Sequence, residues 1–111
     1  MTDFARQWAV AFVLTQVVEI PVYLAFARRL PLGRRWLYAA STSAVTHPLL
    51  WFALPWHAAV TPQVHAALVV AGELGVVAAE ASIGRAFRAP RPLLAAAVAN
   101  TTSVLVGLLV Q

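Results

Sequence analysis

The chain has 111 residues, of which 61% are hydrophobic and only 11% are charged. Ordinary soluble domains are roughly 45–50% apolar and about 25% charged, because a small domain must cover a large surface with polar groups. The composition therefore excludes an ordinary soluble domain and predicts one domain whose main partner is the lipid bilayer. The net charge of +4 comes from arginine alone, and the lack of cysteine excludes disulfides and thiolate chemistry.

Four apolar runs approach or reach the ~20 residues that a helix needs to cross a ~30 Å hydrocarbon core. They predict transmembrane helices over residues 8–27, 36–56, 66–87 and 92–110, all within a single domain at 1–111. Because the gaps are short, consecutive helices are expected to be antiparallel neighbours. The predicted fold class is thus an all-α membrane protein, an up-down bundle of four transmembrane helices.

The first run, residues 8–27, carries Gln16 and Glu19 on one helix face. At 1.5 Å per residue, Glu19 lies about 12 Å in from the arginine-rich end of its helix. Pro21 is expected to kink this helix and to free a backbone carbonyl beside Glu19. A signal peptide over this run is disfavoured, because Glu19 interrupts its apolar region and arginines follow at once.

The second run, residues 36–56, places Ser43, Thr46 and His47 inside the expected bilayer. Ser43 and His47 share a helix face, and His47 lies about 16 Å deep, near the midplane. Pro48 directly follows His47 and would add a free carbonyl acceptor nearby. His47 is as consistent with a hydrogen-bonded packing histidine as with a proton-binding or metal-binding one.

The third run, about residues 66–87, follows Thr61 and Pro62, which suit an N-cap and a first helical turn. The segment AGELGVVAAEASIGR at 71–85 contains Glu73 and Glu80. The two glutamates are seven residues apart and so lie about 20° from one another around the helix axis. Glu73 is about 16 Å deep, and Glu80 is about 6–10 Å from the arginine-rich end. For Glu80, an ion pair with a neighbouring arginine is an alternative interpretation.

The fourth run, residues 92–110, places Asn100 and Ser103 on one face, with Asn100 about 12 Å deep. Small residues recur at every fourth position of this run, which lets another helix approach its backbone closely. These positions are Ala95, Ala99, Ser103 and Gly107.

Arginine predicts the orientation of the bundle. Seven of the eight arginines lie in two of the gaps, at 28–35 and 85–91, and the eighth is Arg6. The positive-inside rule therefore places loops 28–35 and 85–91 in the cytoplasm and both termini on the non-cytoplasmic side of a bacterial-type inner (plasma) membrane. Because the arginines lie in gaps and not along one face, no nucleic-acid partner is expected.

The four runs bring ionisable or amide groups to a narrow layer of the bilayer. A charge at the bilayer centre costs about 2.5–3.5 kcal/mol even on the insertion scale, so these side chains are expected to point inward, into one shared site. The candidates for binding protons or ions are Glu19, His47, Glu73, Glu80 and Asn100. The supporting polar residues are Gln16, Ser43, Thr46 and Ser103. If a metal binds, His47 and Glu73 would hold it, and the sequence identifies no cofactor.

The leading functional hypothesis is the binding or movement of protons or a cation. Four helices enclose little space for a conducting path, so a homo-oligomer is expected. A non-catalytic accessory or assembly subunit of a larger membrane complex is the first alternative, with the polar centre dry and fully hydrogen-bonded. An intramembrane enzyme is the second and least favoured, because the sequence lacks H-E-x-x-H, Glu-x-x-His and phosphate-binding glycine signatures.

Overall fold

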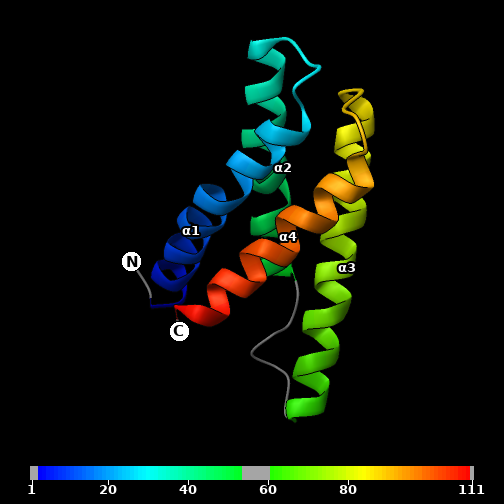
Figure 1. Ribbon diagram of the computed structural model, residues 1–111. Helices are drawn as coiled ribbons and strands as arrows, with labels where there is room; N and C mark the ends of the chain where they lie inside the picture. Colours follow the sequence, from blue (N-terminus) through cyan, green and yellow to red (C-terminus); the bar gives the residue numbers. More distant parts are fainter. Residues whose placement is uncertain (1–2, 54–60, 111) are drawn as a thin grey trace.

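The computed structural model describes residues 3–53 and 61–110, and these contain helices and no strand. The helices are α1 (Asp3–Phe26), α2 (Leu32–Ala53), α3 (Pro62–Ala86) and α4 (Pro92–Leu109). α1 and α3 run toward one end of the bundle, and α2 and α4 return, so both chain ends lie at the opposite end (Figure 1). The all-helical prediction with four helices is confirmed.

Three of the helices, α1, α2 and α3, begin earlier than the apolar runs suggest. The side chain of Thr61 accepts a hydrogen bond from the backbone N–H of Val64 at 3.1 Å, so α3 begins at Pro62, where the cap pattern predicts a start. α1 begins at Asp3, whose carboxylate near the helix N-terminus suits the helix dipole. Of the second expected helix, residues 54–56 lie outside the described residues.

The first turn is shorter than the predicted loop 28–35. α2 begins at Leu32, so Arg34 and Arg35 belong to its first turn and not to the loop. The guanidinium of Arg35 donates hydrogen bonds to the carbonyl oxygens of Arg28 at 3.0 Å and Leu30 at 3.3 Å. Arg35 therefore satisfies backbone carbonyls just beyond the end of α1, where no further helical N–H is available to them.

The second turn brings α3 and α4 into close contact. Gly84 lies where the two helices meet, and a Cβ added to it would lie 2.8 Å from the Cβ of Pro92. The turn itself contains Arg88 and Arg91, both with positive φ, at 59° and 47°. Only a residue without a side chain at position 84 allows this approach.

The helices form a closed ring in which α1 and α3 each pack against both α2 and α4. A hydrophobic core fills the end of the ring that carries the two turns. Its largest members are Tyr23 and Tyr38, whose rings meet edge to face with centroids 5.1 Å apart. Smaller core residues surround them: Ala27, Leu30, Ala39, Ala89, Ala95 and Ala99. At this end, side chains therefore fill the interior of the bundle.

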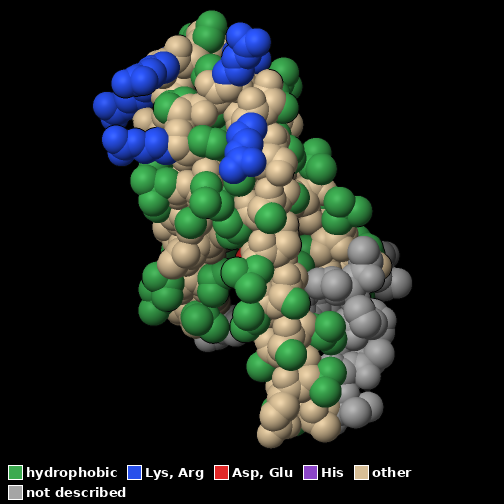
Figure 2. Space-filling view, turned by 90° about the vertical axis from the view of Figure 1, so that its right-hand side faces the viewer, with side chains coloured by type: hydrophobic (Ala, Val, Ile, Leu, Met, Phe, Trp, Pro, Cys, Tyr) green, Lys and Arg blue, Asp and Glu red, His purple; other side chains and the backbone are tan. Residues whose placement is uncertain are grey.

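Three of the helices, α1, α3 and α4, are long and apolar enough to cross a membrane. α2 is long enough but is less apolar, because it carries two arginines in its first turn and several polar residues near its middle. The outer surface is rich in exposed hydrophobic side chains, for example Leu74 at 67% and Leu109 at 83% exposure. Figure 2 shows the basic side chains gathered at the turn end, with hydrophobic ones along the rest of the bundle. These features fit a membrane protein.

The small residues on α4 are closely packed at one end of the row and not at the other. Ala95 and Ala99 are fully buried, and the hydroxyl of Ser103 reaches Glu19 on α1 at 2.7 Å. Gly107, by contrast, has no atom within 4 Å of the position of a Cβ. Close packing of α4 thus extends from the turn end as far as Ser103, and open space begins beyond it.

Candidate functional site

Glu80 lies at the inner end of the open space and receives hydrogen bonds from the other three helices. The hydroxyl of Tyr23 and the amide of Asn100 donate to its Oε1, the amide at 2.6 Å, and the hydroxyl of Thr46 donates to its Oε2 at 2.5 Å. Its side chain is 1% exposed. No arginine contacts it, so the alternative of an ion pair near the turn is wrong among the described residues.

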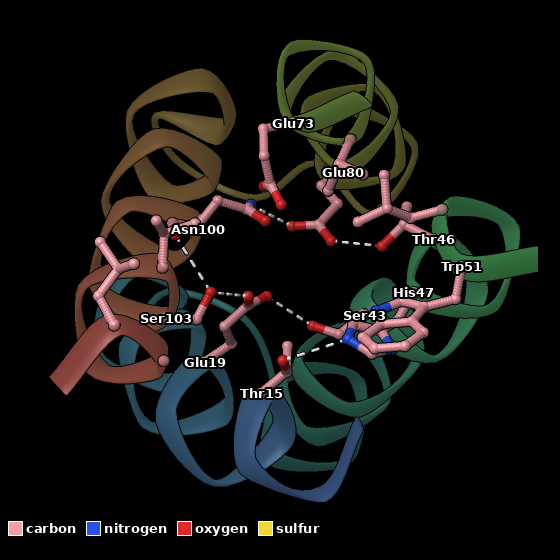
Figure 3. A pocket seen from close by; sticks show the side chains of 15 residues that line it. Thr15, Glu19, Ser43, Thr46, His47, Trp51, Glu73, Glu80, Asn100 and Ser103 are labelled. Atoms are coloured by element: carbon pink, nitrogen blue, oxygen red, sulfur yellow. Dashed lines mark hydrogen bonds between the residues drawn. The ribbon is translucent and has the colours of Figure 1, made fainter. Parts of the chain in front are cut away.

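Glu19 lies opposite Glu80 in the ring and has the same kind of environment (Figure 3). Ser43 on α2 and Ser103 on α4 each donate a hydroxyl hydrogen bond of 2.7 Å, one to each carboxyl oxygen. Glu19 is also 1% exposed. Both glutamates are thus held by neutral donors on neighbouring helices, and neither forms an ion pair within residues 3–53 and 61–110.

A cavity of about 260 Å³ separates these two glutamates and extends away from the turn end. Its polar lining consists of Thr15, Glu19, Ser43, Thr46, His47, Glu73, Glu80, Asn100 and Ser103. Toward the chain ends, its walls become apolar and aromatic, with Leu50, Trp51, Val104 and Leu108. At the turn end, the buried Tyr23–Tyr38 pair lies beside Glu80, to which the hydroxyl of Tyr23 donates. The lining is therefore polar near Glu19 and Glu80 and becomes apolar toward the end of α2.

Glu73 differs from the other two glutamates. It lines the cavity and is half-buried, yet it makes no hydrogen bond with any other described residue. In Figure 3 its carboxyl group points inward, toward Asn100. Glu73 is therefore the carboxyl group in the cavity that remains available to a ligand.

The three glutamates line one cavity, so negative charges on their carboxyl groups would act on one another. Like charges in a medium of low dielectric repel each other strongly. The neutral donors around Glu19 and Glu80 offset part of the cost of removing these groups from water, but they bring no positive charge. The cavity therefore holds three acidic side chains that form no ion pair within residues 3–53 and 61–110.

His47 lies beside the cavity within an aromatic group. Its ring stacks on Trp51 with centroids 6.1 Å apart and meets Phe12 edge to face at 5.6 Å. Its Nε2 is 3.4 Å from the hydroxyl of Thr15, and its buried Nδ1 has no hydrogen-bond partner. Within the described part of the chain, no three His, Cys, Asp or Glu side chains come together as metal ligands.

The structure brings all five candidate binding residues to one cavity: Glu19, His47, Glu73, Glu80 and Asn100. Three of the four supporting residues, Ser43, Thr46 and Ser103, line the same cavity. Gln16 does not. Its amide donates a hydrogen bond to the carbonyl of Ala40 at 3.2 Å, and its side chain lines a groove on the outside of α1.

Two residues of the site, Tyr23 and Thr15, are missing from the sequence-based set. Tyr23 donates a hydrogen bond to Glu80, and Thr15 contacts His47. Each lies four residues from Glu19 along α1, one on either side, and i,i+4 residues share a helix face. That spacing is a usable signal, because residues four positions before and after Glu19 lie on its side of the helix.

Comparison with models of protein families, with curated proteins and with solved structures finds no match for this chain. The functional interpretation therefore depends on the geometry of the cavity and on the chemistry of its lining.

Proposed function

We propose that this protein binds protons or a small cation in its interior and moves them at least part of the way across an inner membrane. The observation that carries the proposal is the sharing of one cavity by Glu19, Glu73 and Glu80, none of which forms an ion pair among the described residues. Intramembrane carboxylates are costly, and they mark ion or proton pathways more often than structural sites.

The three carboxyl groups have different roles in this proposal. Glu19 and Glu80 hold the shape and negative potential of the site, since hydroxyl and amide donors fix both of their oxygens. Glu73 is the exchanging group, because its carboxyl has no donor to displace. Asn100 and His47 complete the wall around it and can donate or accept hydrogen bonds as the charge of Glu73 changes.

The proposal includes a membrane arrangement. α2 is the fourth span, which its place in the ring between α1 and α3 supports, and the arginine-rich turns face the cytoplasm by the positive-inside rule. The cavity then faces the non-cytoplasmic side. A path through the whole bilayer needs either an opening of the Tyr23–Tyr38 layer or a second copy of the chain.

The test uses purified protein in liposomes of neutral lipid, with an imposed proton or Na⁺ gradient and an internal dye as the readout. Glu73→Gln keeps the size and hydrogen-bonding shape of the side chain but cannot release a proton. We expect it to lower the flux by about tenfold or more while the protein keeps its helix content, because loss of one charged contact changes affinity by that order.

The matched control is Ser82→Ala, a polar residue on the exposed side of the same helix, whose flux should equal that of the unaltered protein. If Glu73→Gln conducts as well as Ser82→Ala, Glu73 is not the exchanging group. The polar centre then serves only to hold the helices together, as in an accessory subunit.

A further inference from the structure

A second space lies between α3 and α4, on the outside of the bundle. It measures about 360 Å³. Its outer walls are apolar, and they include Leu74 and Leu105, which are 67% and 56% exposed. The other apolar residues along it are Val69, Val70 and Val77. In Figure 1, α4 leans away from α3 toward the end opposite the turns, which leaves room for this groove.

The groove and the central cavity share part of their lining. Glu73, Asn100 and Val104 line both spaces. Only one layer of side chains therefore separates the polar cavity from the apolar groove. If the bundle spans a bilayer, the groove faces the lipid tails, and Glu73 stands at the boundary between lipid and cavity.

Two observations indicate the charge of an occupant. The carboxyl of Glu73 has no donor among the described residues, and it lines the same cavity as the carboxyl groups of Glu80 and Glu19. His47, which is only 8% exposed, lines the cavity with a buried Nδ1 that has no partner. The site has spare hydrogen-bonding capacity and three acidic groups with no ion-pair partner among the described residues, so it suits a positively charged head group.

The sizes of the two spaces indicate the shape of an occupant. Pockets that bury a whole drug-sized ligand have volumes of roughly 300–1,000 Å³, and the central cavity, at about 260 Å³, lies below that range. It has room for a small head group but not for a long chain as well. The apolar groove provides about 360 Å³ directly beside it.

We propose that this site takes a monocationic amphiphile, a single alkyl chain with an ammonium head, which enters from the bilayer between α3 and α4. This inference rests on the proposed function and names the class of cation. The head group lies in the cavity lined by Glu73, Asn100 and Trp51, and the chain lies along Leu74 and Leu105. A zwitterionic phospholipid is excluded as the occupant, because its phosphate would meet the three carboxyl groups.

The experiment compares two probes on protein in nanodiscs of neutral lipid, with proton release into a weakly buffered solution as the readout. Tetramethylammonium represents the head group alone, and dodecyltrimethylammonium carries the chain as well. Leu105→Trp and Val70→Trp fill the groove from α4 and from α3 respectively. Leu109→Trp is the control, because Leu109 is 83% exposed on α4 and lies outside the groove.

Both groove-filling variants should raise the dodecyltrimethylammonium concentration for half-maximal release by about tenfold or more, since the chain loses its buried methylene contacts. Their response to tetramethylammonium should not change, and Leu109→Trp should respond to both probes like the unaltered protein. Two variants on different helices guard against a local folding defect in either one.

Two other outcomes would each contradict a different part of the proposal. If the groove-filling variants leave both responses unchanged while Glu73→Gln abolishes them, entry through the groove is wrong and the proposed cation site stands. If Glu73→Gln releases protons like the unaltered protein with both probes, the cation site itself is wrong, and the amphiphile proposal is overturned with it.

Discussion

At the scale of single residues, the three glutamates show how one side-chain type takes different roles in one cavity. Glu80 accepts three hydrogen bonds and Glu19 accepts two, whereas Glu73 accepts none among the described residues. A carboxyl group whose oxygens are occupied by fixed donors is difficult to recruit for a ligand. The pattern of donors, more than depth in the bundle, therefore separates structural carboxyl groups from the available one.

Removing the Glu80 acceptor should destabilise the bundle. Glu80→Leu would leave Tyr23, Thr46 and Asn100 without their partner in a buried place, and each unpaired donor costs about 1–3 kcal/mol. Glu80→Gln keeps one carbonyl acceptor and should cost much less. Thermal unfolding in a mild detergent, followed by circular dichroism, measures both. Equal melting temperatures for the two variants would contradict the role of Glu80 as a hydrogen-bonded anchor.

At the scale of elements, the turn between α3 and α4 is a tight junction. Gly84 lies against Pro92 at the start of α4, and the hydroxyl of Tyr38 would lie 3.1 Å from a Cβ at position 84. The backbone N–H of Ala89 also bonds to the carbonyl of Gly84 at 2.9 Å. One residue without a side chain thus lets α3, α4 and the tyrosine layer meet.

Gly84→Ala should therefore destabilise the protein, although alanine is normally the better residue in a helix. The added methyl group overlaps Pro92, and overpacking of this kind costs about 1–3 kcal/mol. Gly75→Ala on the same helix is the control. Its Cβ would meet nothing within 4 Å, so we expect no loss of stability or a small gain. Unfolding midpoints of the two variants in detergent give the comparison, and a Gly84→Ala midpoint as high as that of Gly75→Ala would contradict the close contact.

The sequence carries enough information to predict the helices and the inward direction of most polar residues. Apolar length and the Thr61-Pro62 cap indicate where helices lie, and the cost of buried charge directs Glu19 and Glu80 inward. The sequence does not reveal which donors bind which carboxyl groups, because those pairs join residues far apart in the chain. Gln16 illustrates the limit. It lies 60° around the helix from Glu19, and a carbonyl of α2 binds it away from the cavity.

At the scale of the whole molecule, the two helical hairpins depend on each other. Glu19 in the first hairpin binds Ser43 of its own hairpin and Ser103 of the other. Glu80 in the second hairpin binds Asn100 of its own and Thr46 of the other. Each hairpin alone would leave a buried carboxyl group with only part of its donors, so the closed ring forms a polar network that neither hairpin completes.

The membrane orientation gives a test of the whole arrangement. Reporter domains fused after Gln111 should lie on the non-cytoplasmic side, and a reporter inserted between Pro31 and Leu32 should lie in the cytoplasm, because arginine is concentrated at the turns. Alkaline phosphatase and a fluorescent protein report opposite sides and can be compared at both positions. A cytoplasmic position for the fusion after Gln111 would reverse the proposed orientation and would turn the open end of the cavity toward the cytoplasm.

In the proposed function, the edge-to-face pair of Tyr23 and Tyr38 determines which side of the membrane can exchange ions with the cavity. If the cavity exchanges with one compartment only, its occupancy follows the concentration in that compartment and does not depend on the opposite one. Movement of the proposed cation to the other side would require the rings to separate, which forfeits an aromatic contact of about 0.5–1.5 kcal/mol and the bond from Tyr23 to Glu80. If the rings rarely separate, the proposed cation would bind and leave from one side of the membrane only. If they separate often, the protein would carry the cation across. The strength of this ring pair sets the balance between the two behaviours.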